Sequence, residues 1–177
     1  MNADPRHSWL GEAAIRTCNR RRAAASGERL WDAARSVRVG ETPRLGRLIR
    51  WRIPGTSPGQ SFFDLFSAYP FVVLDHGPRL LVSGLCGRIW TLARDYPALQ
   101  GPDDFRAWRR PGTVRVAFAH SVHELDDRCA ELISEACVEP VDRAARMRLL
   151  LTWAVLGRFE RLIGGEALAV AARRAEE

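Results

Sequence analysis

Two histidines three residues apart, His120 and His123, are the first candidates for chemistry in this sequence. They lie in a segment, 113–123, that alternates apolar and polar residues and is therefore predicted to be a strand. Residues three apart in a strand point to opposite faces of the sheet, so the two imidazoles should not share a metal ion, and no metal site is predicted. His120 falls on the apolar face with Phe118. It is either a core histidine with a satisfied hydrogen bond, or an acid, base or hydrogen-bond donor in a pocket.

Glu135 and Arg148 form a second candidate pair. Glu135 lies in a predicted strand at 128–139, and its direction stays open because both phases of that strand carry apolar residues. If Glu135 faces the interior it needs a countercharge, and Arg148, which shares a helix face with Thr152, is the expected partner. The alternatives are a solvated carboxylate at Glu135 and an arginine that extends to water at Arg148.

The segment Gly55-Thr56-Ser57-Pro58-Gly59 matches the G-x-S-x-G pattern of serine hydrolases. That pattern carries a nucleophile only when a buried strand precedes the serine and a helix packs directly after it. Here a predicted helix precedes the segment and a proline follows Ser57, so a polar turn is the better interpretation.

The spacing of the cysteines gives no sign of a metal or redox site. The four cysteines, Cys18, Cys86, Cys129 and Cys137, include no C-x-x-C pair and are expected to be reduced, buried thiols.

The net charge is +6, but the basic residues, all arginine, alternate with acids, and Arg20-Arg21-Arg22 is the only tight basic run. A nucleic-acid surface would need a basic stripe with stacking aromatics, so no nucleic-acid partner is predicted. Without a secretory segment or a run long enough to span a bilayer, the chain is predicted to be cytoplasmic and not an integral membrane protein.

The elements that would position these residues follow a loose polar lead at 1–9, and residues 10–177 are predicted to form one domain. Strands are predicted at 10–18, 69–74, 79–85, 113–123 and 128–139, with 87–91 as an extension of the sheet, and helices at 26–37 and 43–53. Segment 19–25 is predicted to be a turn, 61–68 either a short helix or a strand, and 96–104 a loop. A long amphipathic helix, 142–172, closes the chain, with Asp142 as its N-cap and a kink or loosening at Gly164-Gly165. Its turn at 149–156 is apolar almost all round and is expected to be covered on more than one side.

This order of elements excludes alternating βαβ units and predicts an α+β fold. We expect a curved antiparallel β-sheet wrapped around the long C-terminal helix, with two short helices after strand 1. The closing helix is the only predicted element long enough to cover one face of such a sheet.

Three stretches carry a likeness to a known family. They are 26–34 (Ser-Gly-Glu-Arg-Leu-Trp-Asp-Ala-Ala), 71–74 leading to 81–90, and the last strand passing into 146–153. The sequence resembles the START-like, helix-grip superfamily, also called SRPBCC, and is most similar to its bacterial polyketide cyclase/dehydrase and lipid-transport group. The resemblance implies a cavity between sheet and C-terminal helix that takes a hydrophobic small molecule, without a cofactor.

Three functions are therefore compatible with the sequence, and the oligomeric state stays open. The first is a binding protein for a small hydrophobic ligand, lipid or polyketide-like. Its expected ligand-binding residues are Trp90, Phe118, His120, Glu135, Arg148, Thr152, Val155 and Phe159. The alternative is a cyclase, aromatase or dehydratase-type enzyme, which requires His120, Glu135 and Arg148 to converge in one cavity. The third is a regulatory or partner-binding protein with a filled core. No complete catalytic set is recognisable, so ligand binding ranks first.

Overall fold

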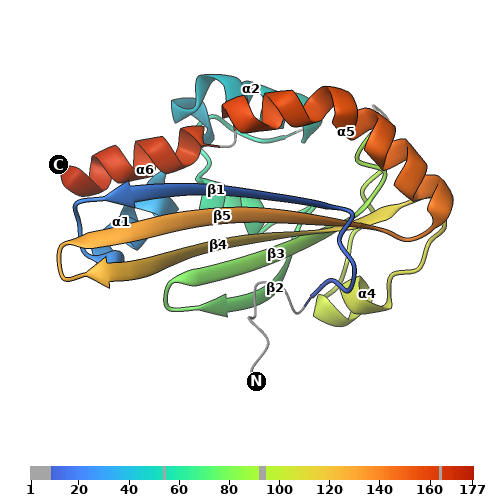
Figure 1. The fold of residues 1–177 in the computed structure, drawn as a ribbon, viewed down its shortest axis with the longest axis horizontal. Helices are drawn as coiled ribbons and strands as arrows, with labels where there is room; N and C mark the ends of the chain where they lie inside the picture. The colour runs from blue at the N-terminus through green and yellow to red at the C-terminus, as the bar shows by residue number, and fades with distance from the viewer. Residues whose placement is uncertain (1–8, 54, 92–94, 164) are drawn as a thin grey trace.

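The computed structural model describes residues 9–53, 55–91, 95–163 and 165–177, except for the side chains of residues 155, 156 and 158–163. Its five strands form one antiparallel sheet in the order β1-β5-β4-β3-β2. The strands are β1 (Ile15–Ala23), β2 (Val72–Gly77), β3 (Leu80–Gly87), β4 (Val114–Asp126) and β5 (Cys129–Pro140). The helices are α1 (Gly27–Ser36), α2 (Pro43–Arg52), α3 (Phe62–Phe66), α4 (Pro102–Ala107), α5 (Arg143–Ile163) and α6 (Glu166–Glu176), with a 3-10 turn, η1 (Val39–Glu41). The sheet is curved, and α1, α2, α5 and α6 lie along one side of it (Figure 1). The predicted α+β architecture, a curved antiparallel sheet with a C-terminal helix across it, is confirmed.

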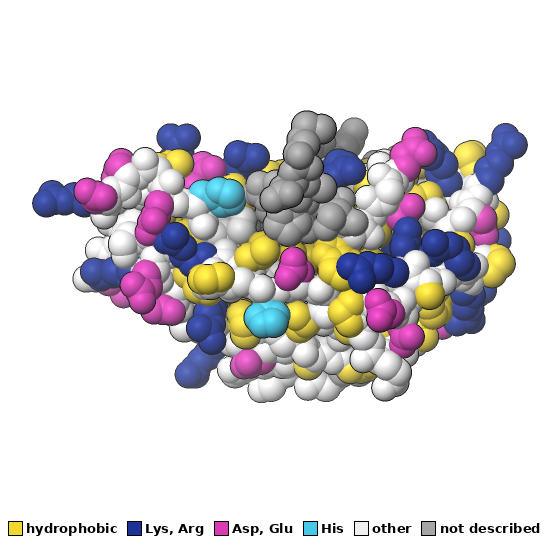
Figure 2. Space-filling view, turned by 90° about the horizontal axis from the view of Figure 1, so that it is seen from below, with side chains coloured by type: hydrophobic (Ala, Val, Ile, Leu, Met, Phe, Trp, Pro, Cys, Tyr) yellow, Lys and Arg dark blue, Asp and Glu magenta, His cyan; other side chains and the backbone are white. Residues whose placement is uncertain are grey.

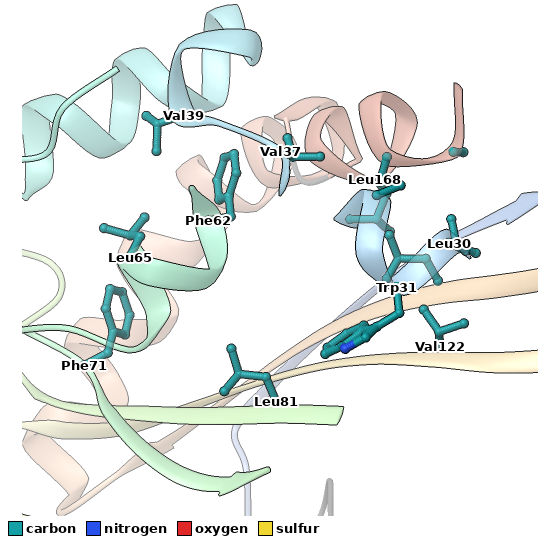
Figure 3. Packing of buried hydrophobic residues seen from close by; sticks show 14 of the residues in the cluster. Leu30, Trp31, Val37, Val39, Phe62, Leu65, Phe71, Leu81, Val122 and Leu168 are labelled. Atoms are coloured by element: carbon teal, nitrogen blue, oxygen red, sulfur yellow. The ribbon is translucent and has the colours of Figure 1, made fainter. Parts of the chain in front are cut away.

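The two faces of the sheet carry separate apolar clusters. On the concave face, strand residues such as Leu81 and Leu132 pack with Trp31 and Leu168 from the helices. Figure 3 shows Trp31 of α1 directed toward Leu81 of β3, and Leu168 of α6 above them. On the outer face a smaller cluster gathers under Phe105 of α4, which is fully buried. A sheet covered on both faces has apolar residues in both phases of its strands, which limits what alternation can reveal.

Trp9 belongs to the outer cluster. The indole is 8% exposed and meets the ring of Phe105 edge to face, with 6.5 Å between centroids. The last residue of the expected loose lead is therefore part of the packed domain, and residues 1–8 lie outside the described part of the chain.

The closing element consists of two helices. Asp142 starts α5 as predicted, because its Oδ1 accepts a hydrogen bond from the backbone N–H of Ala145 at 2.7 Å. The division falls at the Gly-Gly pair, with Gly165 preceding α6 and Gly164 outside the described residues. It is α6 that packs on α1 and β1, burying Leu168, Ala171, Ala172 and Ala175. Helices α1, α2 and α3 share the concave face with it, so the closing element is not the only cover.

The first half of α5 touches the rest of the protein through one face only. Leu149 is 2% exposed, whereas Leu150 is 43% and Leu151 69% exposed. The expectation that 149–156 is covered on more than one side is therefore wrong for these residues. No helix in the described ranges combines the length and apolar character needed to cross a membrane.

Strand β1 begins and ends later than predicted. It starts at Ile15 rather than residue 10, and it runs through the arginine triplet that was expected to form a turn. In this stretch β1 stays paired with β5 through Ala23, and alternate arginines, Arg20 and Arg22, lie 3.6 and 3.2 Å from Glu131 of β5. Cys18 lies on the same side of this strand and is exposed, contrary to the expectation of a buried thiol. On the face seen in Figure 2, basic and acidic side chains are interspersed rather than gathered into one basic stripe.

Short helices account for the other differences. Segment 61–68 contains α3, whose N-cap Ser61 accepts a hydrogen bond from the N–H of Asp64 at 3.0 Å. The expected loop at 96–104 runs into α4, which starts with Pro102 and carries two aspartates in its first turn. Strand β3 ends at Gly87 with φ +145, so the sheet does not extend to residue 91.

Candidate functional site

A cavity of about 420 Å³ lies between the concave face of the sheet and the helices. Alternate residues of β1, β5, β4 and β3 form its floor, and α1, α2, α3, α5 and α6 contribute its walls and roof. The lining is mostly apolar and aromatic, and its larger side chains include Trp31, Leu45, Leu48, Ile49, Phe62, Phe63, Leu65, Phe66, Phe71, Leu81, Ile89, Phe118 and Trp153. In Figure 3, Phe62, Leu65 and Phe71 stand on one side and Trp31 on the other, with Leu81 beneath. This size and composition are those of a small-molecule site.

The floor residues show that the cavity is accessible space rather than loose packing. Phe118, His120, Ser134 and Ala136 sit in β4 and β5, which are flanked by a strand on each side, yet none is fully buried. Their accessible surface faces the cavity, because they line it. Leu48 also lines the cavity and is 40% exposed, so the cavity extends to the surface beside α2.

An aromatic cluster forms one wall. The rings of Phe66 and Phe71 lie 4.9 Å apart, and those of Phe66 and Phe118 lie 5.3 Å apart. Phe66 belongs to α3, so the Ser61 cap that starts this short helix also positions the wall. Tilted and edge-to-face pairs of this kind favour a fixed arrangement of the rings. The wall therefore gives the cavity a defined apolar shape.

A row of polar side chains crosses the floor. Asn19 of β1 is in register with Ser134 of β5, which is in register with His120 of β4, and all three line the cavity. The Nε2 atom of His120 is inaccessible to solvent and has no hydrogen-bond partner among the described residues. Burial lowers the pKa of His120 from 6.5 to about 4, so the imidazole is neutral at pH 7. A neutral imidazole presents one donor and one acceptor. The row therefore presents uncharged polar residues to the cavity.

Arg52, in the last turn of α2, is the second polar feature of the cavity wall. Its guanidinium donates to the carbonyl oxygens of Thr91 at 2.7 Å and Ile89 at 3.2 Å, and it contacts the hydroxyl of Tyr96, which also lines the cavity. Tyr69 donates its hydroxyl hydrogen to the carbonyl oxygen of Tyr96 at 2.9 Å. These contacts attach the segment after β3 to α2 and bring a cation to the cavity.

Of the predicted ligand-binding residues, Phe118 and His120 line the cavity, whereas Glu135 does not. Strand β5 directs Leu132, Ser134, Ala136 and Val138 toward the cavity, and Glu135 is in the opposite phase, on the outer face. Arg148 is exposed on α5 and is not part of the cavity lining. Glu135 and Arg148 therefore do not pair inside the cavity, and the three residues required for the enzymatic alternative do not converge.

The remaining predicted residues are placed as follows. Trp90 packs against the main core but does not line the cavity, unlike its neighbour Ile89. Thr152 donates its hydroxyl hydrogen to the Arg148 carbonyl oxygen of its own helix at 2.9 Å. The side chains of Val155 and Phe159 lie outside the described set.

The face of α5 that meets the domain is rotated by one residue from the predicted one. Ala145 and Leu149 are buried, and Trp153, four residues further on, lines the cavity. This i, i+4, i+8 stripe replaces the predicted face through Arg148 and Thr152. The signal for it was present in the sequence, but the nearly continuous apolar character around Leu149 concealed which phase faces inward.

The two histidines lie on opposite faces of β4, and the segment 55–59 follows a helix. His120 lines the cavity, whereas His123 is exposed and lies 3.3 Å from the hydroxyl of Ser121, two residues away on the same face. Ser57 is an exposed turn residue whose hydroxyl accepts a hydrogen bond from the N–H of Gly59 at 3.2 Å, and α2 rather than a strand precedes it. Within the described ranges, no three His, Cys, Asp or Glu side chains are grouped so as to hold a metal ion.

No family model and no curated protein matches this chain. Several solved structures are similar to it, and two of them cover most of the chain. One is a hypothetical protein, jhp0584, from Helicobacter pylori, at 11% identity over 99% of this chain and 97% of that one, with a TM-score of 0.41. The other is the ZhuI aromatase/cyclase from Streptomyces sp. R1128, at 15% identity over 90% and 94%, with a TM-score of 0.32. At these scores neither likeness carries an argument about function, and the interpretation of the cavity rests on its own geometry.

Proposed function

We propose that this protein binds a small hydrophobic molecule, lipid or polyketide-like, in the cavity between the concave face of the sheet and the helices. The observation that carries the proposal is an apolar, aromatic cavity of about 420 Å³ beneath the helices. The START-like resemblance of segments 26–34 and 81–90 is part of the same proposal.

The polar row on the floor gives the ligand an orientation. Asn19, Ser134 and His120 offer neutral hydrogen-bonding groups in an otherwise apolar enclosure. A ligand carbonyl or hydroxyl placed on this row would meet polar side chains instead of apolar surface. Few polar groups in an apolar cavity are the usual means of fixing a ligand's direction.

Binding is favoured over catalysis because the cavity lacks a complementary acid–base pair. Among the described lining residues there is no carboxylate, and His120 is held neutral by burial. Glu135 on the outer face and Arg148 at the surface cannot act on a molecule in the cavity. The polar row and the apolar lining of the cavity can therefore recognise a ligand, and they lack the groups needed to transform it.

Fluorescence of N-phenyl-1-naphthylamine, an uncharged probe that brightens in apolar sites, tests the proposal. The wild-type protein should bind the probe saturably with one site per chain. Ala136 lies on the cavity floor, so Ala136→Leu should fill part of the space and weaken binding by about tenfold or more, an effect of about 1.4 kcal/mol. The matched control is Ala144→Leu, because Ala144 is exposed at the start of α5.

Two results would count against the proposal. One is the absence of saturable probe binding to the folded wild-type protein. The other is equal binding by wild type and Ala136→Leu. Native mass spectrometry of the purified wild-type protein adds an independent measurement, since a molecule carried through purification should appear as a mass increment that Ala136→Leu reduces.

A further inference from the structure

Arg52 carries a positive charge that no acidic side chain balances in the described part of the chain. Its hydrogen-bond partners are two backbone carbonyls and the hydroxyl of Tyr96, none of them charged. The side chain is half-buried and lines an apolar cavity. A cation next to apolar surface is costly without a countercharge, so this end of the cavity favours an anion.

Two described acids on neighbouring segments, Asp95 and Glu166, are engaged elsewhere. Asp95, next to Tyr96, lies 3.8 Å from the guanidinium of Arg88 and 3.4 Å from that of Arg110. Glu166, at the start of α6, accepts hydrogen bonds from the backbone N–H groups of Arg44 and Leu45, at the opposite end of α2 from Arg52. Helix α2 itself contains four arginines and no acid. Among the residues that the structure describes, the charge of Arg52 therefore meets no countercharge, and we expect it to be available to a ligand.

The guanidinium is also held in place and has donors to spare. Its carbon lies 5.7 Å from the ring centroid of Tyr96 and 5.6 Å from that of Trp51. A guanidinium has five N–H donors, and the three hydrogen bonds to Thr91, Ile89 and Tyr96 leave two for a ligand. A positioned cation with free donors suits a carboxylate better than a flexible amine would.

We propose that the ligand is an amphipathic anion of the carboxylate class, with its apolar part in the cavity and its head group on Arg52. This inference rests on the proposed function, and it adds the charge of the ligand and the residue that selects it. Dodecanoate, a medium-chain fatty acid, serves as the probe of this class.

Arg35 is the other arginine at the cavity, and it does not fit this role. It is exposed, and its guanidinium lies over the ring of Phe63 at 4.7 Å. An ion pair made in water is weak because solvent screens both charges. Arg35 therefore serves as a control at the same cavity.

The experiment compares dodecanoate with 1-dodecanol as competitors of N-phenyl-1-naphthylamine at pH 7.5. The alcohol is the more apolar of the two, so an apolar cavity without a cation should prefer it. We expect the wild-type protein to prefer dodecanoate by about tenfold or more, an effect of about 1.4 kcal/mol. Arg52→Gln should abolish or reverse this preference and still bind the probe. Arg52→Lys should retain part of it.

Two matched variants separate a local effect from loss of one positive charge. Arg47→Gln removes an exposed arginine of the same helix that does not line the cavity, and Arg35→Gln removes the exposed one that does. Both should keep the preference for dodecanoate. A preference that persists in Arg52→Gln, or that is lost equally in Arg35→Gln, would overturn the assignment to Arg52.

The outcomes also separate this inference from the proposed function. If probe, acid and alcohol all fail to bind the folded wild type, the proposed function fails and this inference with it. If acid and alcohol bind equally well, the function stands and the inference fails.

Should Arg52→Gln not fold, ¹³C NMR of carboxyl-labelled dodecanoate bound to the wild-type protein provides a second test. Its carboxyl signal should stay at the ionised position when the pH falls below the pKa of the free acid, and normal titration would contradict the inference.

Discussion

The imidazole of His120 lies against the ring of Phe66, with 4.5 Å between the ring centroids. The contact joins β4 to α3 and places a titratable group in the aromatic wall of the cavity. Burial lowers the pKa of His120 to about 4, because the packed wall disfavours the charged form of the imidazole. Protonation of this residue therefore opposes folding.

Stability should consequently fall as the pH is lowered from about 6.5 toward 4. In that interval the unfolded chain, with a histidine pKa near 6.5, binds a proton that the folded chain does not, so the free energy of unfolding rises with pH. The shift corresponds to a loss of at most about 3 kcal/mol at the acid end. Urea unfolding of wild type and His120→Gln at pH 7 and pH 4.5 measures the effect. His120→Gln should lose less stability than wild type over this range, and equal losses would contradict the assignment.

The sequence was sufficient to predict β3, β4 and β5 of the cavity floor and the side chains that alternate along β4, whereas β1 was predicted too early in the chain. Phe118 and His120 could be assigned to the inner face because their strand has one clear apolar phase. Glu135 could not be assigned, since β5 is apolar in both phases and the sheet is covered on its outer face as well. Which phase faces the cavity depends on the covering elements, and α4 was not predicted.

Arg52 escaped sequence reasoning for a different reason. Its partners Ile89, Thr91 and Tyr96 lie 37 to 44 residues away along the chain. No local period or cap relates such positions, because the contact is created by the packing of α2 over the end of β3. Features of this kind are visible only once the fold is known.

The ion pair between Arg115 and Glu139 should contribute to stability. The two residues are paired across β4 and β5, their side chains are 13% and 19% exposed, and the charged atoms lie 2.6 Å apart. Glu139→Gln leaves the arginine without its countercharge and should lower the free energy of unfolding by about 1–3 kcal/mol. The comparison is Asp103→Asn, which removes an exposed partner of Arg106 and an acid from the first turn of α4, and should cost less than about 1 kcal/mol. Urea unfolding of the three proteins checks both, and equal effects would contradict a contribution from burial.

The thiols of Cys18 and Cys86 should differ strongly in reactivity. Cys86 is 1% exposed on β3, and burial raises its pKa to about 12, so almost none of it is thiolate at pH 8. Cys18 is exposed on β1. A short pulse of iodoacetamide at pH 8, followed by peptide mass spectrometry, should find Cys18 modified and Cys86 intact. Both should react after unfolding in urea. Modification of native Cys86 at the rate of Cys18 would show that β3 is not packed as described.

Gly84 is expected to be sensitive to a single added methyl group. A Cβ atom at this position of β3 would lie 2.7 Å from the ring of Phe105 and 2.8 Å from Leu74, closer than side-chain atoms normally approach. Gly84→Ala should therefore lower the free energy of unfolding by about 1–3 kcal/mol, because α4 must shift to accommodate it.

Gly77→Ala provides the control for this substitution in urea unfolding. Gly77 is also a strand residue, but its added Cβ would lie 3.6 Å from Leu80, an ordinary contact distance. It should change stability by less than about 0.5 kcal/mol. Combining Gly84→Ala with Phe105→Leu should cost less than the sum of the two single changes, since the smaller side chain makes room for the methyl group. Strict additivity would mean that the ring of Phe105 is not what restricts position 84.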